Sequence, residues 1–217
     1  MLFYLLACQN LSIEDGWRHK DIVQIKDSFT SVFLILDEEP ALIDAGFQSS
    51  GNRVKQALST HDLTPSDIKH VFITHGHGDH LAGLDLYPNA QSYALEAEIE
   101  LIKEETGSGI DVPLADSDII DLGEHTVQVL AVPGHTAGNA VYLTQGVLVL
   151  GDSAVANDDN SIAPPPERFS DNPTKTAEAI VALGERIQSE NLEVDWLAFS
   201  HSGALKGVEA LLDFETE

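Results

Sequence analysis

The sequence predicts a mixed α/β domain in which two packed sheets carry helices on their outer faces. Three observations support this fold class. Short apolar runs typical of buried strands recur along the chain and end in glycine-containing turns. Segments with helical periodicity and acidic outer faces lie between these runs. The chain has 217 residues, 43% of them hydrophobic, and it contains no repeat or low-complexity linker, so it can bury one sizeable core.

The N-terminal third of the chain predicts several strands and one helix. A helix is expected over residues 50–60, because Val54, Ala57 and Leu58 fall on one side at helical spacing. Apolar runs bounded by turn residues predict the strands. These strands are expected at residues 22–25, 31–37, 41–44 and 71–73.

The rest of the chain continues the alternation. Leu95, Ile99 and Ile102 recur at helical spacing among Glu and Lys, which predicts a helix over residues 95–105. Further helices are expected over residues 174–188 and 204–213, and further strands over residues 127–132, 147–150 and 196–199. The segment 153–171 is interpreted as a loop over the functional site, with Arg168 facing solvent and Phe169 packed. The loop 46–51 is a second candidate wall of that site.

The most informative motif directly follows an apolar strand. The six residues from His75 to His80 have the sequence His-Gly-His-Gly-Asp-His. Imidazole nitrogen and carboxylate oxygen are the usual ligands of zinc. His75 and His77 can point the same way, because side chains alternate along an extended backbone. Gly78 lets the chain turn so that Asp79 and His80 are directed at a second point, and one segment can thus serve two ions.

Three further ligand-type side chains follow apolar runs. His135, Asp152 and His201 each stand in a glycine-containing turn after a predicted strand. Because active sites in layered α/β folds gather on loops at strand ends, these side chains are expected to meet the histidine motif. The histidines outside these motifs are interpreted as surface residues. They are His19, His61, His70 and His125.

With these motifs the chain resembles the metallo-β-lactamase-fold hydrolases, on a glyoxalase II-like or lactonase-like branch. The motif series extends from Asp44 to His201. The resemblance implies a four-layer αββα sandwich, expected here as a single domain over residues 21–217. It also implies two metal sites. One is formed by His75, His77 and His135, the second by Asp79, His80 and His201, with Asp152 bridging the two ions and Asp44 supporting the site from behind.

The expected cofactors are two zinc ions, with iron or manganese as alternatives. A water bound between two such ions loses a proton near neutral pH and becomes a nucleophile. Asp79 is the expected catalytic carboxylate, which orients this water or accepts a proton. The predicted function is hydrolysis of an acyl bond, such as that of a lactone or thioester, in a small-molecule substrate.

Three other functions remain open at this stage: a persulfide dioxygenase, a β-lactamase and a non-catalytic scaffold. A persulfide dioxygenase of the same fold would bind a single iron, by resemblance through His75, His135 and Asp152. A β-lactamase is less favoured, because many zinc β-lactamases use a cysteine in the second site and lack a carboxylate corresponding to Asp152. The C-terminal helical domain with which glyoxalase II enzymes bind glutathione is not found in the chain, which disfavours that substrate. A non-catalytic scaffold would not require seven ligand-type residues.

The net charge and the N-terminal segment bear on the partners and the location of the protein. With 36 acidic and 11 basic residues, the formal charge of -25 repels polyanions and argues against a nucleic-acid partner. Residues 1–20 are a separate N-terminal segment, in which Leu5–Cys8 resembles a bacterial lipobox. Either this segment is the remnant of a lipoprotein signal, with the protein anchored at Cys8 in the cell envelope, or the chain as it stands is soluble and cytoplasmic. No run approaches the ~20 apolar residues of a membrane span.

Overall fold

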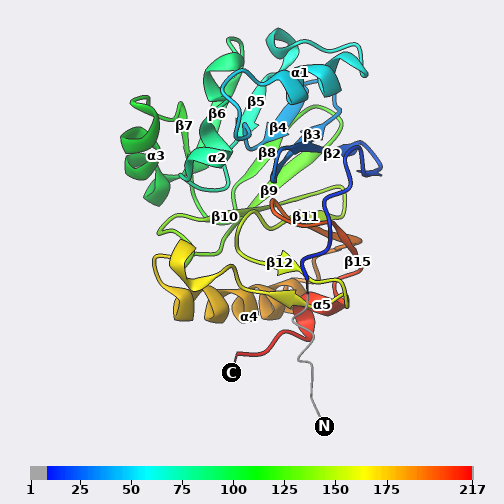
Figure 1. Cartoon of the computed structure of the whole chain (residues 1–217), viewed down its shortest axis with the longest axis vertical. Coiled ribbons are helices and arrows are strands. Elements are labelled where there is room, and N and C mark those ends of the chain that lie inside the picture. The colour runs from blue at the N-terminus through cyan, green and yellow to red at the C-terminus, as the bar shows by residue number, and fades with distance from the viewer. Residues whose placement is uncertain (1–8, 217) are drawn as a thin grey trace.

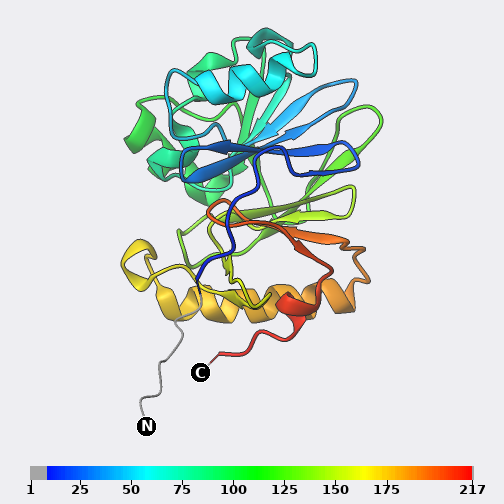
Figure 2. The ribbon, with the colours of Figure 1, turned by 45° about the vertical axis from the view of Figure 1, so that its right-hand side comes forward.

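The computed structural model describes residues 9–216, and in this part of the chain two β-sheets pack face to face between two layers of helices (Figure 1, Figure 2). The expected αββα sandwich is therefore confirmed. The lipid-attachment residue considered from the sequence, Cys8, lies outside the described residues. None of the helices within residues 9–216 is long and apolar enough to cross a membrane.

The first sheet contains seven strands within the described residues. In chain order they are β1 (Arg18–His19), β2 (Ile22–Asp27), β3 (Thr30–Ile35), β4 (Ala41–Ile43), β5 (His70–Phe72), β6 (Gln91–Leu95) and β7 (Val112–Leu114). They lie in this order across the sheet, antiparallel from β1 to β4 and parallel from β4 to β7. Because β4 and β5 are parallel, the loops that follow them leave the same edge of the sheet.

The second sheet lies beneath the first. Its strands are β8 (Ile119–Asp121), β9 (Thr126–Ala131), β10 (Ala140–Thr144), β11 (Val147–Val149), β14 (Trp196–Ala198) and β15 (Leu205–Lys206), in the order β15-β14-β11-β10-β9-β8. The β10 strand is antiparallel to both β9 and β11, and β11 is parallel to β14. The carboxyl ends of β9, β11 and β14 therefore share one edge. A separate pair, β12 (Val155–Ala156) and β13 (Ile162–Ala163), lies in the segment after β11.

Helices cover the outer face of each sheet. The α-helices are α1 (Asn52–Ser59), α2 (Gly78–Leu81), α3 (Ile99–Thr106), α4 (Pro173–Ser189) and α5 (Glu209–Leu212). Short 3-10 turns lie at Pro65–Asp67, Leu84–Leu86, Glu96–Glu98 and Glu167–Phe169. The α4 helix begins close to the predicted residue, because Asn172 accepts a hydrogen bond from the backbone N–H of Lys175 and Pro173 occupies the first turn.

Three hydrophobic clusters separate the four layers. The central cluster lies between the sheets, where Phe72 of the first sheet and Tyr142 of the second pack together. A second cluster joins the first sheet to α1 and α3 through Leu58 and Ile102. The third joins the second sheet to α4 through Ile180 and its neighbours. Both sheets are thus covered on both faces, which explains why their strands are continuous apolar runs rather than alternating patterns.

Two predicted helices differ from those in the structure. The helix expected over residues 95–105 begins only at Ile99, because Gln91–Leu95 form strand β6 between β5 and β7. The helix expected over residues 204–213 is reduced to Glu209–Leu212, because Leu205–Lys206 pair with β14 as strand β15. In both segments, pairing with a neighbouring strand outweighs the local helical pattern.

The prediction that His70 lies on the surface was wrong. The residue is 7% exposed, and its side chain lies within a small polar network. The Nδ1 atom is 2.9 Å from the hydroxyl of Tyr93, and Nε2 is 2.8 Å from a carboxylate oxygen of Glu39. Both ring nitrogens thus have partners, so a histidine can be buried in the first sheet without an unpaired polar atom.

Candidate metal centre

Loops that leave the carboxyl ends of five strands converge on one site. Two of these strands belong to the first sheet and three to the second, so the site lies at the common edge of the sandwich (Figure 1). The strand-end residues are Asp44 after β4, His75 and His77 after β5, His135 after β9, Asp152 after β11 and His201 after β14. Asp79 and His80 follow on the short helix α2.

Three imidazoles form the first half of the site, here called the three-histidine group. It consists of His75, His77 and His135. The Nε2 atom of His75 lies 3.0 Å from Nδ1 of His77, and Nε2 of His135 lies 3.1 Å from each of these two atoms. A tetrahedral site with metal–nitrogen bonds of about 2.0 Å has ligand–ligand edges of about 3.3 Å. The nitrogen triangle therefore has nearly the dimensions of one face of a zinc site.

The second half, here called the mixed group, consists of Asp79, His80 and His201. Nε2 of His80 lies 3.6 Å from Oδ2 of Asp79, and Nε2 of His201 lies 3.3 Å from the same oxygen. The other nitrogen of each imidazole is occupied. His80 donates from Nδ1 to Asp44 at 2.7 Å, and His201 donates from Nδ1 to the carbonyl of Phe29 at 2.9 Å. These bonds fix both rings with Nε2 directed into the site.

The carboxylate of Asp152 lies between the two groups. Its Oδ2 is 3.9 Å from Nε2 of His75 and 3.7 Å from Nε2 of His135. The same oxygen is 3.1 Å from Nε2 of His201, and Oδ1 is 3.4 Å from Nε2 of His80. One carboxylate is thus within 4 Å of imidazoles from both groups, which is the arrangement that a bridging ligand needs.

Asp44 holds the site from the first sheet. Its buried carboxylate accepts hydrogen bonds from the backbone N–H and the hydroxyl of Thr74 and from His80. The hydroxyl of Thr74 in turn lies 3.0 Å from Nδ1 of His75. Asp44 adopts a φ of 62°, a left-handed conformation that costs roughly 1–3 kcal/mol for a residue with a side chain. From this strained position the carboxylate orients His80 of the mixed group directly. Through the hydroxyl of Thr74 it also orients His75 of the three-histidine group.

Two imidazoles of the three-histidine group, those of His75 and His135, are held in the neutral form. Burial lowers the pKa of His75 well below its usual range, and the neighbouring His80 lowers it further. Burial also lowers the pKa of His135 to about 4. Neutral imidazole is the form that binds a metal ion, so this group is ready to act as a ligand set near neutral pH.

In the mixed group, the pKa values of the histidines are raised rather than lowered. Burial lowers the pKa of His80, but the carboxylates of Asp44 and Asp152 outweigh this effect and raise the pKa well above its usual value. Burial likewise opposes protonation of His201, yet hydrogen bonds to Asp152 and Asp79 raise its pKa to about 10. The two carboxylates respond in the reverse sense. Burial raises the pKa of Asp79 and of Asp152, but the adjacent imidazoles outweigh it and hold both pKa values below the usual range.

The donor set fits a pair of divalent cations. Nε2 of His80 and Oδ1 of Asp152 are buried and lie 3.4 Å apart, at ion-pair distance, but neither atom makes a well-formed hydrogen bond. A cation between them would satisfy both, and the mixture of imidazole and carboxylate is the chemistry that zinc, iron and manganese accept.

Glu98 is a residue of this site that the sequence did not reveal. Its side chain is 1% exposed, and its two oxygens accept hydrogen bonds from the backbone N–H groups of Gly76, at 2.7 Å, and Gly138, at 2.6 Å. Gly76 separates His75 from His77, and Gly138 follows the loop of His135. Glu98 therefore ties together the two loops that carry the three-histidine group. It belongs to a segment expected only as an acidic helix, so no sequence signal distinguished it from its exposed neighbours.

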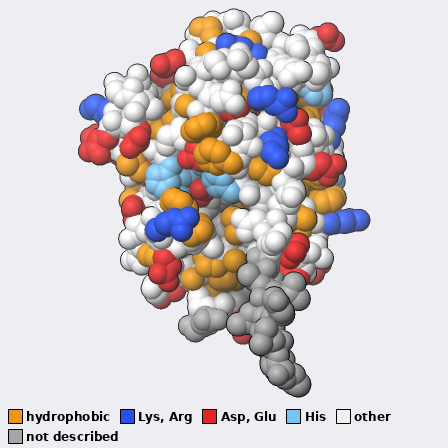
Figure 3. Space-filling model, viewed as in Figure 1, with side chains coloured by type: hydrophobic (Ala, Val, Ile, Leu, Met, Phe, Trp, Pro, Cys, Tyr) orange, Lys and Arg blue, Asp and Glu red, His pale blue; other side chains and the backbone are white. Residues whose placement is uncertain are grey.

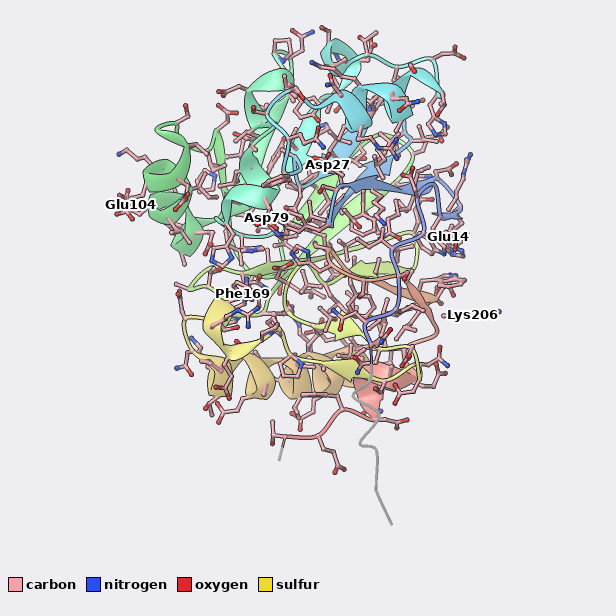
Figure 4. All side chains as sticks on the ribbon, in the orientation of Figure 1. Glu14, Asp27, Asp79, Glu104, Phe169 and Lys206 are labelled. Carbon is pink, nitrogen blue, oxygen red and sulfur yellow. The ribbon has the colours of Figure 1, made fainter. Side chains whose placement is uncertain are left out.

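A cavity of about 580 Å³ leads from the surface to the donor cluster. His77, Asp79, Asp152 and His201 lie in its lining. On this face of the molecule, histidine side chains lie in a hollow flanked by hydrophobic groups (Figure 3). Asp79 comes from α2 in the upper half of the molecule, and Phe169 from the segment before α4 in the lower half (Figure 4). Phe169 is half exposed and also lines the cavity, so the expectation that it is packed was wrong.

All seven predicted ligand-type residues are therefore brought together, and an αββα fold with this donor set defines a class of metal-binding proteins. The chain belongs to the metallo-beta-lactamase superfamily, whose family model matches residues 25–201. Among its relatives is the metallo-beta-lactamase domain-containing protein 1 of Xenopus laevis, which is 31% identical over 59% of this chain and 53% of that protein. A hydroxyacylglutathione hydrolase of Vibrio cholerae is 32% identical over 61% of this chain and 49% of that enzyme.

The chain spans about half the length of the curated relatives that it matches. Solved structures show the same fold. A class B3 di-zinc metallo-beta-lactamase from an Alaskan soil metagenome superposes with a TM-score of 0.66 and 20% identity, over 88% of this chain and 79% of that one. A flavo di-iron protein of Thermotoga maritima superposes with a TM-score of 0.65 and 16% identity, over 85% of this chain and 52% of that one.

Proposed function

We propose that this protein is a hydrolase that uses two divalent metal ions, zinc in the first instance, to cleave an acyl bond of a small molecule such as a lactone or thioester. The observation that carries the proposal is the convergence of donors from two sheets, within 4.8 Å of one another in each group, around a buried nitrogen and a buried oxygen that make no hydrogen bond. The hydrolase relatives at about 30% identity support the same reaction class.

Each ligand-type residue has a role in this proposal. The three-histidine group would hold one ion and the mixed group the other, with Asp152 shared between them. When bound, a pair of divalent cations lowers the pKa of a bound water molecule and polarises the carbonyl oxygen of a substrate. Asp44 orients His80, and Thr74 extends this support to His75, so that neither imidazole has to reorganise during the reaction.

Asp79 is the proposed catalytic carboxylate. It lines the cavity and remains partly exposed, so a substrate or water molecule can reach it. Burial raises its pKa, but the hydrogen bond to His201 and the charge of His80 lower it below the usual value. The side chain is therefore ionised near neutral pH and can accept or orient a proton, which is the role of a general base.

A panel of substrates, assayed on the metal-loaded full chain, tests the proposed function. It should contain lactones, thioesters, a chromogenic β-lactam and a phosphodiester. We expect turnover of lactones or thioesters, and loss of both metal and activity in Asp79→Ala and His75→Ala. Full turnover by the metal-free protein would overturn the proposal.

Metal analysis separates the proposed function from a second candidate. His75, His135 and Asp152 lie close enough to hold one ion without the mixed group, which is the arrangement expected for an iron dioxygenase that acts on persulfides. Protein purified without added metal should contain two zinc ions per chain under our proposal. One iron per chain, with oxygen consumption on a persulfide substrate, would favour the dioxygenase instead.

A further inference from the structure

We propose that the substrate carries an uncharged, apolar chain, which packs against an aromatic wall made of Phe29, Phe47 and Phe169. This inference rests on the proposed function, because it names the part of the substrate that lies beside the bond to be cleaved.

The three exposed phenylalanines of the wall lie around a single cavity. Among the described residues, the exposed large hydrophobic side chains are Phe29, Phe47, Ile119 and Phe169, which are 50%, 46%, 61% and 52% exposed. All three phenylalanines line the cavity over the donor cluster, whereas Ile119 does not. Exposed aromatic groups gathered around a polar centre are typical of a ligand site, since such groups are costly to leave in water.

The apolar lining extends from the surface to the donor cluster. Besides the three phenylalanines, it includes Val155, Pro165 and Pro166. The volume of about 580 Å³ lies within the range of about 300–1,000 Å³ that small-molecule sites occupy. A chain of several methylene groups can therefore lie along the lining while its acyl group reaches the donors.

Phe29 links the wall to the mixed group. It lies in the turn between β2 and β3, and its carbonyl accepts the hydrogen bond from His201. Its ring stacks on the His201 imidazole, with centroids 5.7 Å apart and planes inclined by 12°. Phe47 packs against Phe29 at a centroid distance of 4.8 Å. An apolar group placed on these rings would lie directly beside a proposed ligand.

A buried carboxylate holds the second ring in place. Oδ2 of Asp27, at the end of β2, accepts hydrogen bonds from the backbone N–H groups of Phe47, at 2.9 Å, and Gln48, at 3.0 Å. A Cβ atom at Gly46, where φ is +84°, would come within 2.6 Å of the same oxygen, so only glycine allows this close approach. Asp27 and Asp79 are marked in Figure 4. The Phe47 loop is thus anchored by the body of the first sheet, which reduces the entropy lost when a ligand binds.

The charge of the lining favours an uncharged ligand. No Lys or Arg is found among the described residues that line the cavity, and its two carboxylates, Asp79 and Asp152, are proposed metal ligands rather than partners for the substrate chain. The nearby guanidinium of Arg168 lies 4.4 Å from the ring centroid of Phe169, in a cation–π contact. Arg168 thus places a cation beside the wall, but it lies outside the described lining. A thiol carrier with two free carboxylates, such as glutathione, would find no cation within the lining itself, and a neutral apolar chain requires none.

Matched substrates test the inference. The thioester series consists of S-acetyl- and S-hexanoyl-N-acetylcysteamine, which differ only in chain length, and S-hexanoylglutathione, which differs only in the charged thiol. A lactone pair, γ-butyrolactone and γ-decanolactone, tests chain length on the second bond class. For the bond class that is cleaved, we expect kcat/KM to be about 10- to 100-fold higher for the longer chain. Equal values for short and long chains, or preference for the glutathione thioester, would overturn the inference.

Variants assign the preference to the wall. Phe47→Ala and Phe169→Ala should each lower kcat/KM for the long-chain substrate by more than for the short one, and so remove most of the chain-length preference. The matched control is Ile119→Ala, which removes an equally exposed apolar side chain outside the cavity and should leave the preference unchanged. A preference retained in both phenylalanine variants would overturn the assignment.

A binding measurement keeps the two proposals separate. Octan-1-ol is an uncharged apolar probe, and we expect it to bind the metal-loaded wild type, by saturation-transfer NMR, and not Phe47→Ala. An active enzyme without chain preference would refute only the apolar-chain inference. Binding of octan-1-ol at the wall without turnover of any substrate would refute only the proposed function. Failure of octan-1-ol to bind the wild type would overturn the inference whatever the enzyme hydrolyses.

Discussion

The two halves of the donor cluster differ in their protonation before any metal is present. In the three-histidine group, burial lowers the pKa of His75 and holds the pKa of His135 at about 4, so these two imidazoles are neutral. In the mixed group, burial also opposes charge, but adjacent carboxylates raise the pKa of His80 and bring that of His201 to about 10. One half is therefore a prepared ligand set, and the other is a network of ion pairs.

This comparison shows how histidines in one fold can form two groups with different protonation states. His75 and His135 stay neutral chiefly because they are buried, and the nearby carboxylate of Asp152 does not outweigh burial. His80 and His201 each lie close to two carboxylates that raise their pKa, so these two histidines gain a proton. We therefore expect the first ion to bind the three-histidine group, and the second to bind only as the mixed group loses its protons.

The largest expected effect follows loss of a ligand from the prepared half. His75→Ala removes one corner of the nitrogen triangle and the link through Thr74 to Asp44. We expect kcat/KM to fall by more than about 1,000-fold, with loss of bound metal measured by elemental analysis. The control is His61→Ala, a histidine outside the cluster, which should keep both. A His75→Ala variant with full metal content and activity would remove the distinction between the halves.

The next effect concerns pH and separates the halves directly. Between pH 7 and pH 9, the affinity of the mixed group should rise by up to about 100-fold, because His201, with a pKa of about 10, must release its proton to bind a cation. Over the same range the affinity of the three-histidine group should change much less, because burial lowers the pKa of His75 and holds that of His135 at about 4. Calorimetry in buffers of different ionisation enthalpy measures the protons released with each ion. Equal proton release for both ions would contradict this comparison.

A smaller effect is expected from the residue that joins the ligand loops. Glu98→Ala leaves the N–H groups of Gly76 and Gly138 without their acceptor, so the loops of the three-histidine group should lose their fixed spacing. We expect metal affinity of that group to fall by about 10- to 100-fold, with partial recovery in Glu98→Gln. Glu104→Ala, on the exposed side of α3, is the control. If both alanine variants bind metal like the wild type, Glu98 has no positioning role.

The smallest expected effect is on the stability of the metal-free protein. The pKa of His201 is about 10 in the folded state against about 6.5 when unfolded, so its contribution is complete below pH 6.5 and is lost as pH rises through 10. The pKa of Asp152 is depressed, so its contribution is lost in acid instead. The Tm of the metal-free protein should fall by several degrees between pH 6.5 and pH 10 in thermal unfolding. A Tm that rises over this range would show that the pKa of His201 is not raised in the folded protein.

Much of the site was predictable because its residues are encoded locally. The motif from His75 to His80 sets its own spacing, and glycine-containing turns after apolar strands mark His135 and His201. Such signals depend on backbone geometry near each residue, which the sequence contains directly. The αββα layers followed from the same buried strands together with the family resemblance.

The parts that the sequence did not reveal depend on contacts distant along the chain. Glu98 is one of several acidic residues in its segment, and only the approach of Gly76 and Gly138 distinguishes it. Gln91–Leu95 became a strand because it pairs with β5 and β7. Phe169, expected to pack, joins the cavity wall instead, because the chain before α4 folds back beside the donor cluster.

The most direct test of the two-group account is a count of metal ions per chain by native mass spectrometry. For protein purified without added metal and then loaded with zinc at pH 8, we predict two ions in the wild type. His201→Ala should retain one, because only the mixed group is damaged. A single ion in the zinc-loaded wild type, or two ions bound as tightly in His201→Ala, would contradict the claim that two unequal groups each hold a cation.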